Sequence, residues 1–212
     1  MRALFAVAFA AASFGAAGQA WTIEAPTPAQ KQWVTESGNY KRGCPVGFSQ
    51  LRVLSVRFYG FDRRTHTGQI LVNERYASGL RHVFQQLYAM RFPIRHMNFR
   101  DTYGGPYPKD GDTTASFECR QAAASPCTGG RTGSWSMHAY GEAVDLDPLE
   151  NPYVGCGQTR DPLAVSYMNR SRVRPGMVTP AVIRLFASIG WQWGGSWAGS
   201  TKDYMHFSSN GH

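Results

Sequence analysis

The chain has 212 residues, of which 17% are charged and 13% are aromatic. This composition excludes a largely disordered protein, because disordered chains lack aromatic residues, and the length suits one domain with a full hydrophobic core. The formal charge of +8 favours anionic partners. No basic run, recognition-helix signature or RNA-binding aromatic motif accompanies that charge, so we expect no nucleic-acid partner.

The first twenty residues have the pattern of a signal peptide. An apolar stretch rich in Ala and Phe runs from Ala3 to about Ala17, and small residues at positions 18–20 suit cleavage. The stretch is shorter than the roughly 20 apolar residues that span a bilayer. We expect residues 1–20 to be removed and residues 21–212 to form one exported domain, periplasmic or secreted, monomeric and with no membrane partner. An uncleaved anchor is the alternative.

Four cysteines fit an oxidising compartment: Cys44, Cys119, Cys127 and Cys156. None belongs to a Cys-x-x-Cys pair of the kind that binds zinc, so we predict disulfides. Four cysteines allow three pairings, and the sequence does not decide among them. We favour Cys119 with Cys127, which closes a short loop, and Cys44 with Cys156, which ties down the N-terminal segment.

Two regular elements are predicted in the first half of the chain. Leu54, Val56 and Phe58 alternate with more polar neighbours as in a half-buried strand, which Gly60 ends. From Asn73, apolar residues recur at helical spacing until the boundary before Pro93. The apolar face of this helix consists of Tyr76, Leu80, Val83, Phe84 and Leu87. We expect it to pack behind the sheet.

Two irregular stretches follow this helix. Residues 101–133 are rich in Gly, Asp, Thr and Ser and have no sustained periodicity. Such a long loop in a compact domain is either a functional rim or lid, or a surface excursion pinned by a disulfide. Residues 151–176 form a second irregular stretch, interrupted by Pro and Gly. We expect loops of this kind to wall a cleft.

A second helix is predicted from Thr179 as N-cap and Pro180 as first helical residue, with Gly190 just past its end. It leads into a segment with three tryptophans, of which we expect at least two to pack in the core. Trp197 lies in a Gly/Ser setting and is our candidate for lining a sugar- or peptide-binding groove.

Candidate metal ligands are concentrated in Ser136–Asp145 and Asp203–His206. His138, Asp145 and His206 supply two imidazoles and a carboxylate, and three protein ligands leave the fourth position of a zinc ion free for water. Strand-like alternation after Ala143 puts Asp145 and Asp147 on one face, so spacing alone does not choose between them. Iron oxygenases also use two His and one acid, but their first His and acid lie closer in sequence.

Asp203 is the candidate acid/base, since a second carboxylate near the metal accepts the proton of the water. On a straight strand Asp203 and His206 would point to opposite faces. We therefore expect a bend or a turn of helix between them. If the chain were straight, Glu142 would be the next candidate base.

The residues Ser136, His138, Gly141, Ala143 and Asp145 form the pattern Ser-x-His-x-x-Gly-x-Ala-x-Asp, and Asp-x-x-His follows at Asp203. This pattern resembles the zinc D-Ala-D-Ala carboxypeptidase and L-alanyl-D-glutamate peptidase family, metallopeptidases that trim or cut bacterial cell-wall peptides. Further stretches resemble landmarks of one secreted branch, so that the similarity extends from about position 51 to 207. These stretches are 117–120, 151–153 and 193–195.

The resemblance implies that His138, Asp145 and His206 hold one zinc ion and that Asp203 is the catalytic acid/base. It also implies an arginine that stabilises the substrate carbonyl or carboxylate, for which Arg120 is our candidate and Arg100 the substitute. We assign Ser136 and Trp197 to substrate binding.

We expect an α+β domain in which a small, mostly antiparallel sheet carries the metal site and helices pack behind it. The resemblance implies the hedgehog/D-Ala-D-Ala-peptidase type of this fold. It further implies peptidoglycan stem peptides as substrate, with anionic wall polymers as possible further partners. The alternative is a wall-binding domain that contains zinc and performs no hydrolysis. The spare acid at Asp203 argues against that alternative, because a structural site is usually closed by a fourth protein ligand.

Overall fold

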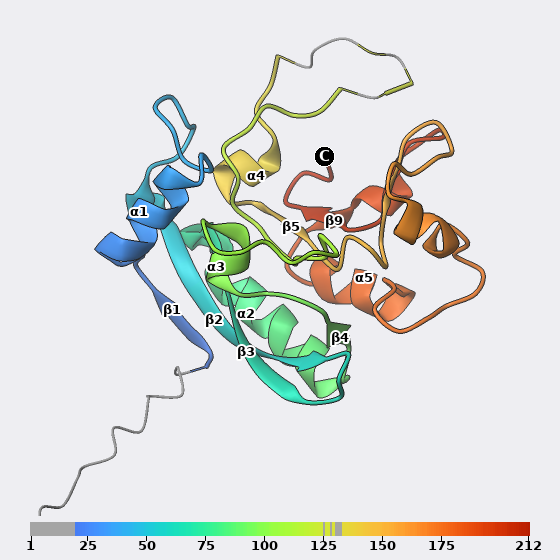
Figure 1. The fold of residues 1–212 in the computed structure, drawn as a ribbon, viewed down its shortest axis with the longest axis horizontal. Coiled ribbons are helices and arrows are strands. Elements are labelled where there is room, and N and C mark those ends of the chain that lie inside the picture. The colour runs from blue at the N-terminus through green and yellow to red at the C-terminus, as the bar shows by residue number, and fades with distance from the viewer. Residues whose placement is uncertain (1–19, 125, 128, 130–132) are drawn as a thin grey trace, which may run out of the picture.

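The computed structural model describes residues 20–124, 126, 127, 129 and 133–212 (Figure 1). The predicted signal peptide falls on residues 1–19 outside the described residues, apart from its last position. Within the described part of the chain, no helix has both the length and the apolar character needed to cross a bilayer.

The largest sheet is built around one long strand, β2 (Leu51–Gly60). It pairs antiparallel with β1 (Thr22–Glu24) on one side and with β3 (Thr65–Asn73) on the other, and its end pairs parallel with β4 (Pro93–Ile94). The strand predicted around Leu54–Phe58 is therefore confirmed and is longer than its alternation indicates.

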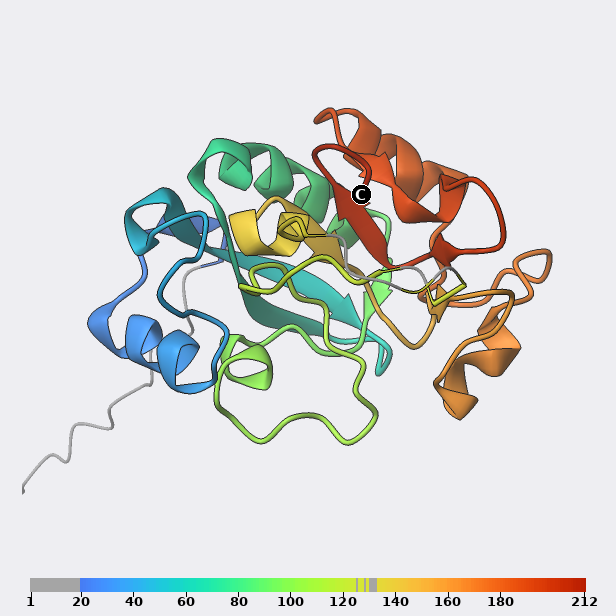
Figure 2. The same cartoon turned by 90° about the horizontal axis from the view of Figure 1, so that it is seen from above.

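Helices cover both faces of this sheet, as Figure 2 shows. On one face, α2 (Glu74–Ala89) and α5 (Pro180–Ala187) pack on the alternate residues Leu54, Val56 and Phe58. On the other face, α1 (Pro28–Glu36) and the short α3 (Phe99–Thr102) pack on Leu51 and Val53. The first half of β2 is thus buried on both faces, and the half-buried strand that we predicted is found only in its second half, from Arg57.

Both predicted helices are confirmed. α2 begins after Asn73, whose side chain accepts a hydrogen bond from the backbone N–H of Arg75. Four of the five predicted apolar residues are buried; Tyr76 is half-buried at the edge of the core, and Ala77, which was not predicted, is buried in addition. α5 begins at Pro180 as predicted, and the chain reverses at Gly190, which has φ +82°.

Two smaller sheets complete the part of the chain that the structure describes. β5 (Ala143–Asp145) and β7 (Gln192–Trp193) flank β9 (His206–Ser208), and all pairings are antiparallel. β6 (Tyr153–Val154) pairs antiparallel with β8 (Lys202–Asp203). The short α4 (Met137–Tyr140) precedes β5. Among the described residues, 3₁₀ helices span Phe48–Gln50, Pro162–Tyr167 and Gly194–Ser196.

The β5–β9–β7 sheet is joined to the main core through its central strand. Phe207 of β9 stacks on Phe186 of α5, with ring centroids 3.9 Å apart. Val144 of β5 belongs to the same buried cluster. The fold is α+β, as predicted, and a small antiparallel sheet is anchored on helices and on the main sheet.

The disulfide pairing that we favoured is wrong. Cys44 bonds to Cys119 and Cys127 bonds to Cys156. Cys119 is buried, and its backbone N–H donates to the carbonyl of Asn39 at 3.0 Å, which brings it beside Cys44. The chain then leaves the core at Gln121 and returns at Trp135, where the two residues form a bridge. Cys119 and Cys127 are close in sequence but lie in different environments.

The loop predicted over residues 101–133 is only partly a rim. Its central part is buried: Asp112, Thr113, Thr114, Ser116, Phe117 and Cys119. Ala115 pairs with Asp145, with N–H to carbonyl distances of 3.1 and 2.9 Å. This part of the loop is therefore an interior layer beside β5.

Candidate active site

His138 is positioned by α4, a single turn of helix with specific residues at both ends. The Ser136 hydroxyl accepts a hydrogen bond from the His138 N–H at 3.3 Å and so caps the helix start. Gly141 ends the helix at φ +67°, and its carbonyl accepts from the Asn73 N–H at 2.8 Å. A Cβ at Gly141 would lie 2.8 Å from that nitrogen. Glycine is therefore required there for both the turn and the close approach.

The β5–β9 pairing brings the other two predicted ligands together. Asp145 and His206 are direct cross-strand partners in this register, so their side chains share one face of the sheet. His138 reaches the same point from α4. We call His138, Asp145 and His206 the triad.

The ligand atoms of the triad converge on one point. His138 Nε2 lies 3.2 Å from Asp145 Oδ2 and 3.2 Å from His206 Nδ1, and His206 Nδ1 lies 3.1 Å from Asp145 Oδ1. Ligand atoms about 2.0–2.1 Å from a tetrahedral zinc ion would be roughly 3.3 Å apart. The three spacings therefore fit one zinc ion.

A backbone carbonyl sets the protonation of His138. The imidazole Nδ1–H donates to the Ser116 carbonyl at 2.6 Å, because a carbonyl oxygen can only accept. Neutral His138 therefore presents an unprotonated Nε2 to the point where the triad converges. Histidines that bind metals are commonly held this way, with the second ring nitrogen donating to a carbonyl or carboxylate.

The charges of the triad also favour a cation. Burial acts against ionisation of Asp145, but the two imidazoles outweigh it and hold the pKa of Asp145 well below its usual range. Burial likewise disfavours a charged His138, yet the Asp145 carboxylate raises the pKa of that imidazole. Asp145 is thus a carboxylate at any ordinary pH, as a metal ligand must be.

Asp145 and Asp147, for which spacing predicted a common face, are separated in the structure. β5 ends at Asp145, and Asp147 has φ +43°, which interrupts the alternation of a strand. The fully buried side chain of Asp147 accepts hydrogen bonds from the Arg95 N–H and the Thr114 hydroxyl. The expectation of a shared face was wrong.

Asp203 and His206 lie on two different strands, β8 and β9, so the expected bend between them is present. Gly194 allows it: a Cβ there would lie 2.7 Å from the Asp203 carbonyl oxygen and 3.3 Å from the His206 Cβ. The Asp203 Oδ1 is buried without a hydrogen-bond partner among the described residues. Burial, with the nearby Asp145 carboxylate, raises the pKa of Asp203 to about 7.

Of the two candidate arginines, Arg120 lies beside the triad and Arg100 does not. The Arg120 carbonyl accepts from the N–H of Ser136, and its guanidinium pairs with Glu118 at 2.7 Å. Burial and Asp145 have the larger effects on the pKa values of His138 and Asp203. The positive charge of Arg120 lowers both pKa values. The Arg100 guanidinium instead stacks 4.3 Å from the ring centroid of Trp33.

Ser136 and Trp197 both lie close to the triad. The Ser136 hydroxyl is buried and caps α4, so its observed contact positions His138. The Trp197 ring centroid is 6.0 Å from that of His206, and its indole N–H donates to the Gly211 carbonyl. Half-buried Trp197 thus stands at the border of the site.

The structure adds one residue that the sequence did not single out for a role. Tyr153 lies directly opposite Asp203 in the β6–β8 pair, so the two side chains share a face. Burial and the Asp203 charge raise the pKa of Tyr153. Its only sequence signal was its place in the 151–153 stretch.

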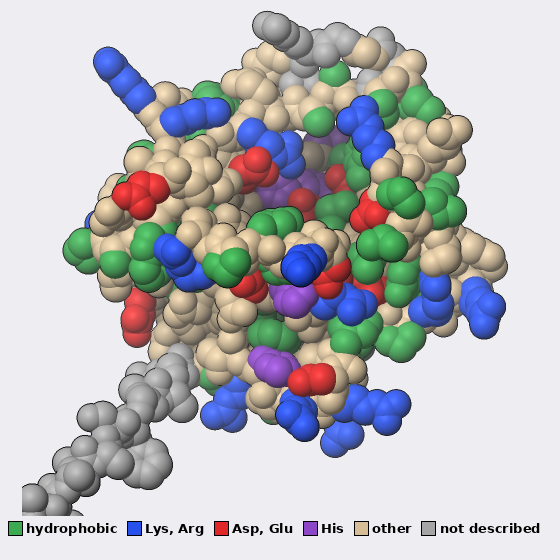
Figure 3. Space-filling view, in the orientation of Figure 1, with side chains coloured by type: hydrophobic (Ala, Val, Ile, Leu, Met, Phe, Trp, Pro, Cys, Tyr) green, Lys and Arg blue, Asp and Glu red, His purple; other side chains and the backbone are tan. Residues whose placement is uncertain are grey.

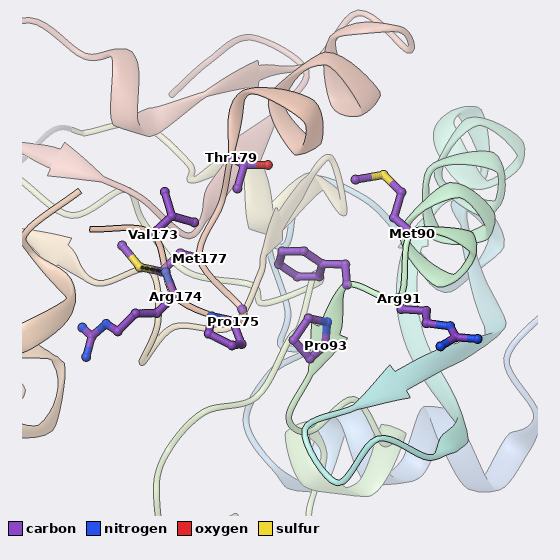
Figure 4. Close-up of a pocket in the computed structure, with 10 residues that line it drawn as sticks. Met90, Arg91, Pro93, Val173, Arg174, Pro175, Met177 and Thr179 are labelled. Carbon is purple, nitrogen blue, oxygen red and sulfur yellow. Dashed lines mark hydrogen bonds between the residues drawn. The ribbon is translucent and has the colours of Figure 1, made fainter. Parts of the chain in front are cut away.

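The site opens on one face of the molecule. Figure 3 shows histidine and acidic side chains gathered in a hollow, with Lys or Arg and further acidic side chains at its rim. A separate cavity of about 370 Å³ lies between the end of α2 and residues 173–179 (Figure 4). Met90, Pro93, Pro175 and Met177 are among its lining residues. None of the residues that line this cavity is an acid, a histidine or a cysteine, so the cavity has no side chain of the kind that the triad and Asp203 provide.

A comparison with known protein families gives a match in the segment that contains this site. A family model described as D-alanyl-D-alanine carboxypeptidase matches residues 129–209. Residues 129–209 are therefore similar to that family. The matched segment contains all three triad residues and Asp203, and the match supports a cell-wall peptidase in general. No curated protein and no solved structure matches the chain.

Proposed function

We propose that this protein is an exported zinc peptidase that hydrolyses peptide bonds in peptidoglycan stem peptides. One observation carries the proposal: three ligand atoms lie 3.1–3.2 Å from one another, with an unprotonated His138 Nε2 and a buried acid, Asp203, close by. The family match over residues 129–209 supports the same reaction class.

His138 Nε2, Asp145 and His206 Nδ1 would hold the zinc ion. When bound, such an ion polarises the scissile carbonyl and lowers the pKa of a water molecule towards neutrality. Three protein ligands leave room for that chemistry, whereas structural zinc sites are usually closed by four. This favours an enzyme over a wall-binding domain that contains zinc without hydrolysis.

Asp203 would move the proton. Its carboxylate accepts a proton from the attacking water as the new C–O bond forms, and returns it to the amine nitrogen as the C–N bond breaks. A pKa raised to about 7 by burial suits both steps, since the group gains and loses a proton at little cost near neutral pH. The unpartnered Oδ1 is available for this exchange.

Arg120 would stabilise the negative charge of the substrate, either on the carbonyl oxygen during attack or on a terminal carboxylate. Its place next to the cap of α4 supports this role. Ser136 would act mainly through the orientation of His138. Trp197 and Tyr153 would border the bound peptide on either side of the His206–Asp203 bend.

Export is supported by two disulfides and by the predicted signal peptide. The formal charge of +8 favours association with anionic wall polymers. We propose that the mature chain acts as a monomer.

Incubation of the zinc-loaded chain with purified sacculi, followed by mass spectrometry of the products, tests the function. We expect release of D-alanine, or new amino termini at an L-Ala–D-Glu bond or a crosslink, and the masses identify which bond is cut. Asp203→Asn, with zinc bound, is the control for contaminating peptidases. Binding to sacculi without any new amine would support the non-catalytic alternative.

A further inference from the structure

A second group of converging acids shares no residue with the triad. Asp112, Asp147 and Glu150 are each fully buried, and each offers an oxygen within 4.8 Å of those of the other two. They come from separate segments: Asp112 from the loop before α4, and the other two from the turn after β5. We call these three residues the acidic cluster.

Among the residues that the structure describes, two basic side chains contact the acidic cluster, Arg95 at its carboxylates and Arg170 at the backbone carbonyl of Glu150, which lies 2.9 Å away. Arg95 Nε donates to Asp112 Oδ2 at 2.8 Å, and its Nη2 donates to Glu150 Oε1. Three carboxylates and the Arg95 guanidinium leave a formal charge of −3 + 1 = −2. Burying such a charge costs several kcal/mol per ion unless it is compensated. Fully ionised, the carboxylates would therefore have two negative charges more than Arg95 compensates, and burial with the neighbouring carboxylates accordingly raises the pKa of Asp112 to about 8 and that of Asp147 well above its usual range.

Two oxygens of the acidic cluster have no partner. Asp147 Oδ1 accepts from the Arg95 N–H at 3.1 Å, and Glu150 Oε1 accepts from the Tyr167 hydroxyl at 3.3 Å. Asp147 Oδ2 and Glu150 Oε2 are buried and accept no hydrogen bond from any described residue. Buried carboxylate oxygens are almost always hydrogen-bonded or bound to a cation. The unpaired atoms therefore point to a ligand.

We propose that the acidic cluster binds one calcium ion, distinct from the ion of the triad. A dication brings the formal charge of the cluster and Arg95 to zero. Ca²⁺ binds oxygens at 2.3–2.6 Å, so that two ligands on opposite sides are up to about 5 Å apart, which accommodates a spacing within 4.8 Å.

The set of donors favours calcium over the other common cations. All three groups are carboxylates, whereas zinc sites in proteins favour nitrogen and sulfur. Mg²⁺ keeps several waters and seldom takes more than two carboxylates, which a fully buried cluster does not suit. Arg95, which contacts the acidic cluster, also lines a cavity of about 360 Å³ with Phe61 and His96.

Calcium here would bind two segments that support the triad. Asp147 follows Asp145 by two residues, and Asp112 precedes the segment whose Ser116 carbonyl orients His138. The ion would link these segments. We therefore expect it to stabilise the fold and to leave the zinc stoichiometry unchanged.

The test uses the full chain, stripped of metals on a chelating resin and reloaded with one equivalent of zinc. Equilibrium dialysis against CaCl₂ with elemental analysis should find one calcium in addition to one zinc. The midpoint of thermal unfolding should rise with calcium concentration. Glu150→Gln should weaken calcium binding by about tenfold or more, since affinity depends on the number of charged ligands, and should keep one zinc.

The matched control is Glu36→Gln, which changes an exposed acid of α1 and should bind calcium as the unaltered chain does. The unaltered chain alone can overturn the proposal, whether or not Glu150→Gln folds. If the unaltered chain binds no calcium at millimolar CaCl₂, and its thermal unfolding midpoint does not change, the proposal is wrong. That result would indicate that the carboxyl groups of the acidic cluster are protonated. Equal binding of Mg²⁺, or full calcium affinity in a folded Glu150→Gln, would also overturn it.

Discussion

The triad and the acidic cluster share no residue, yet they use carboxylates only two positions apart, Asp145 at the end of β5 and Asp147 just after it. Asp145 shares its site with two imidazoles, and its side chain is 22% exposed. Asp147 shares its site with Asp112 and Glu150, and all three are fully buried. The triad thus suits zinc, and the acidic cluster suits a hard cation bound by oxygen. Neighbouring acids acquire different chemistry from the groups that distant segments bring to them.

Asp145→Asn tests this separation with the largest expected effect. The amide removes the negative ligand between the two imidazoles, so zinc should be lost. Activity on sacculi should fall by at least about a thousandfold, because a catalytic metal contributes several kcal/mol to the reaction. Metal analysis and product release measure the two effects.

The matched variant is Asp147→Asn, which retains an oxygen to accept from the Arg95 N–H. It should keep one zinc and change activity by less than about tenfold, since it leaves the triad intact. Loss of zinc from Asp147→Asn would show that the two regions do not act separately.

Asp203→Asn separates metal binding from proton transfer. We expect a full zinc content and a loss of activity of about 10²–10⁴-fold, as for removal of a general acid/base. Zinc content, and turnover of sacculi at a fixed pH, are the measurements. Undiminished turnover would remove Asp203 from the mechanism and return Glu142 to consideration.

Gly141→Ala tests the backbone that places His138. Its positive φ costs about 1 kcal/mol or more, and contact with the Asn73 nitrogen adds to this, so the free energy of unfolding should fall by about 2–4 kcal/mol. Urea denaturation measures it. Gly157→Ala is the control, because its φ of +79° is similar but its Cβ would meet no atom within 4 Å. Equal losses in both variants would mean that the close approach to Asn73 contributes nothing.

Ser136→Ala should have the smallest effect. Loss of the N-cap of α4 should lower the free energy of unfolding by about 1 kcal/mol. If Ser136 acts only through His138, KM for a soluble stem peptide should stay unchanged while zinc affinity falls modestly. A raised KM with unaltered zinc affinity would instead support the direct substrate contact that we predicted.

Local patterns predicted the elements whose stability is local. α2 has a capping side chain at Asn73, whereas the predicted cap Thr179 of α5 makes no side-chain capping hydrogen bond. Both helices have apolar faces within their own sequences, and β2 has a clear alternation. β3 escaped prediction because its first half, Thr65–Gln69, is polar and its second half is buried on both faces, so no alternation is visible. The interior part of the 101–133 loop was not predicted for a related reason. Its backbone groups form hydrogen bonds with β5 and β3, which lie far away in sequence.

The sequence by itself determined the residue types of the triad, the spare acid Asp203, the two long helices and the presence of disulfides. The family resemblance, and not residue spacing, implied Asp145 as the third ligand. Tertiary structure decided which cysteines pair, what surrounds Asp147, and that a carbonyl from Ser116 orients His138. The physical reason is that a sequence motif specifies which side chains can bind a metal or transfer a proton. The groups that contact those side chains come from segments remote in sequence, and packing brings them together. Asp145 and Asp147 are alike in sequence, and only the chain packed around each one makes them different.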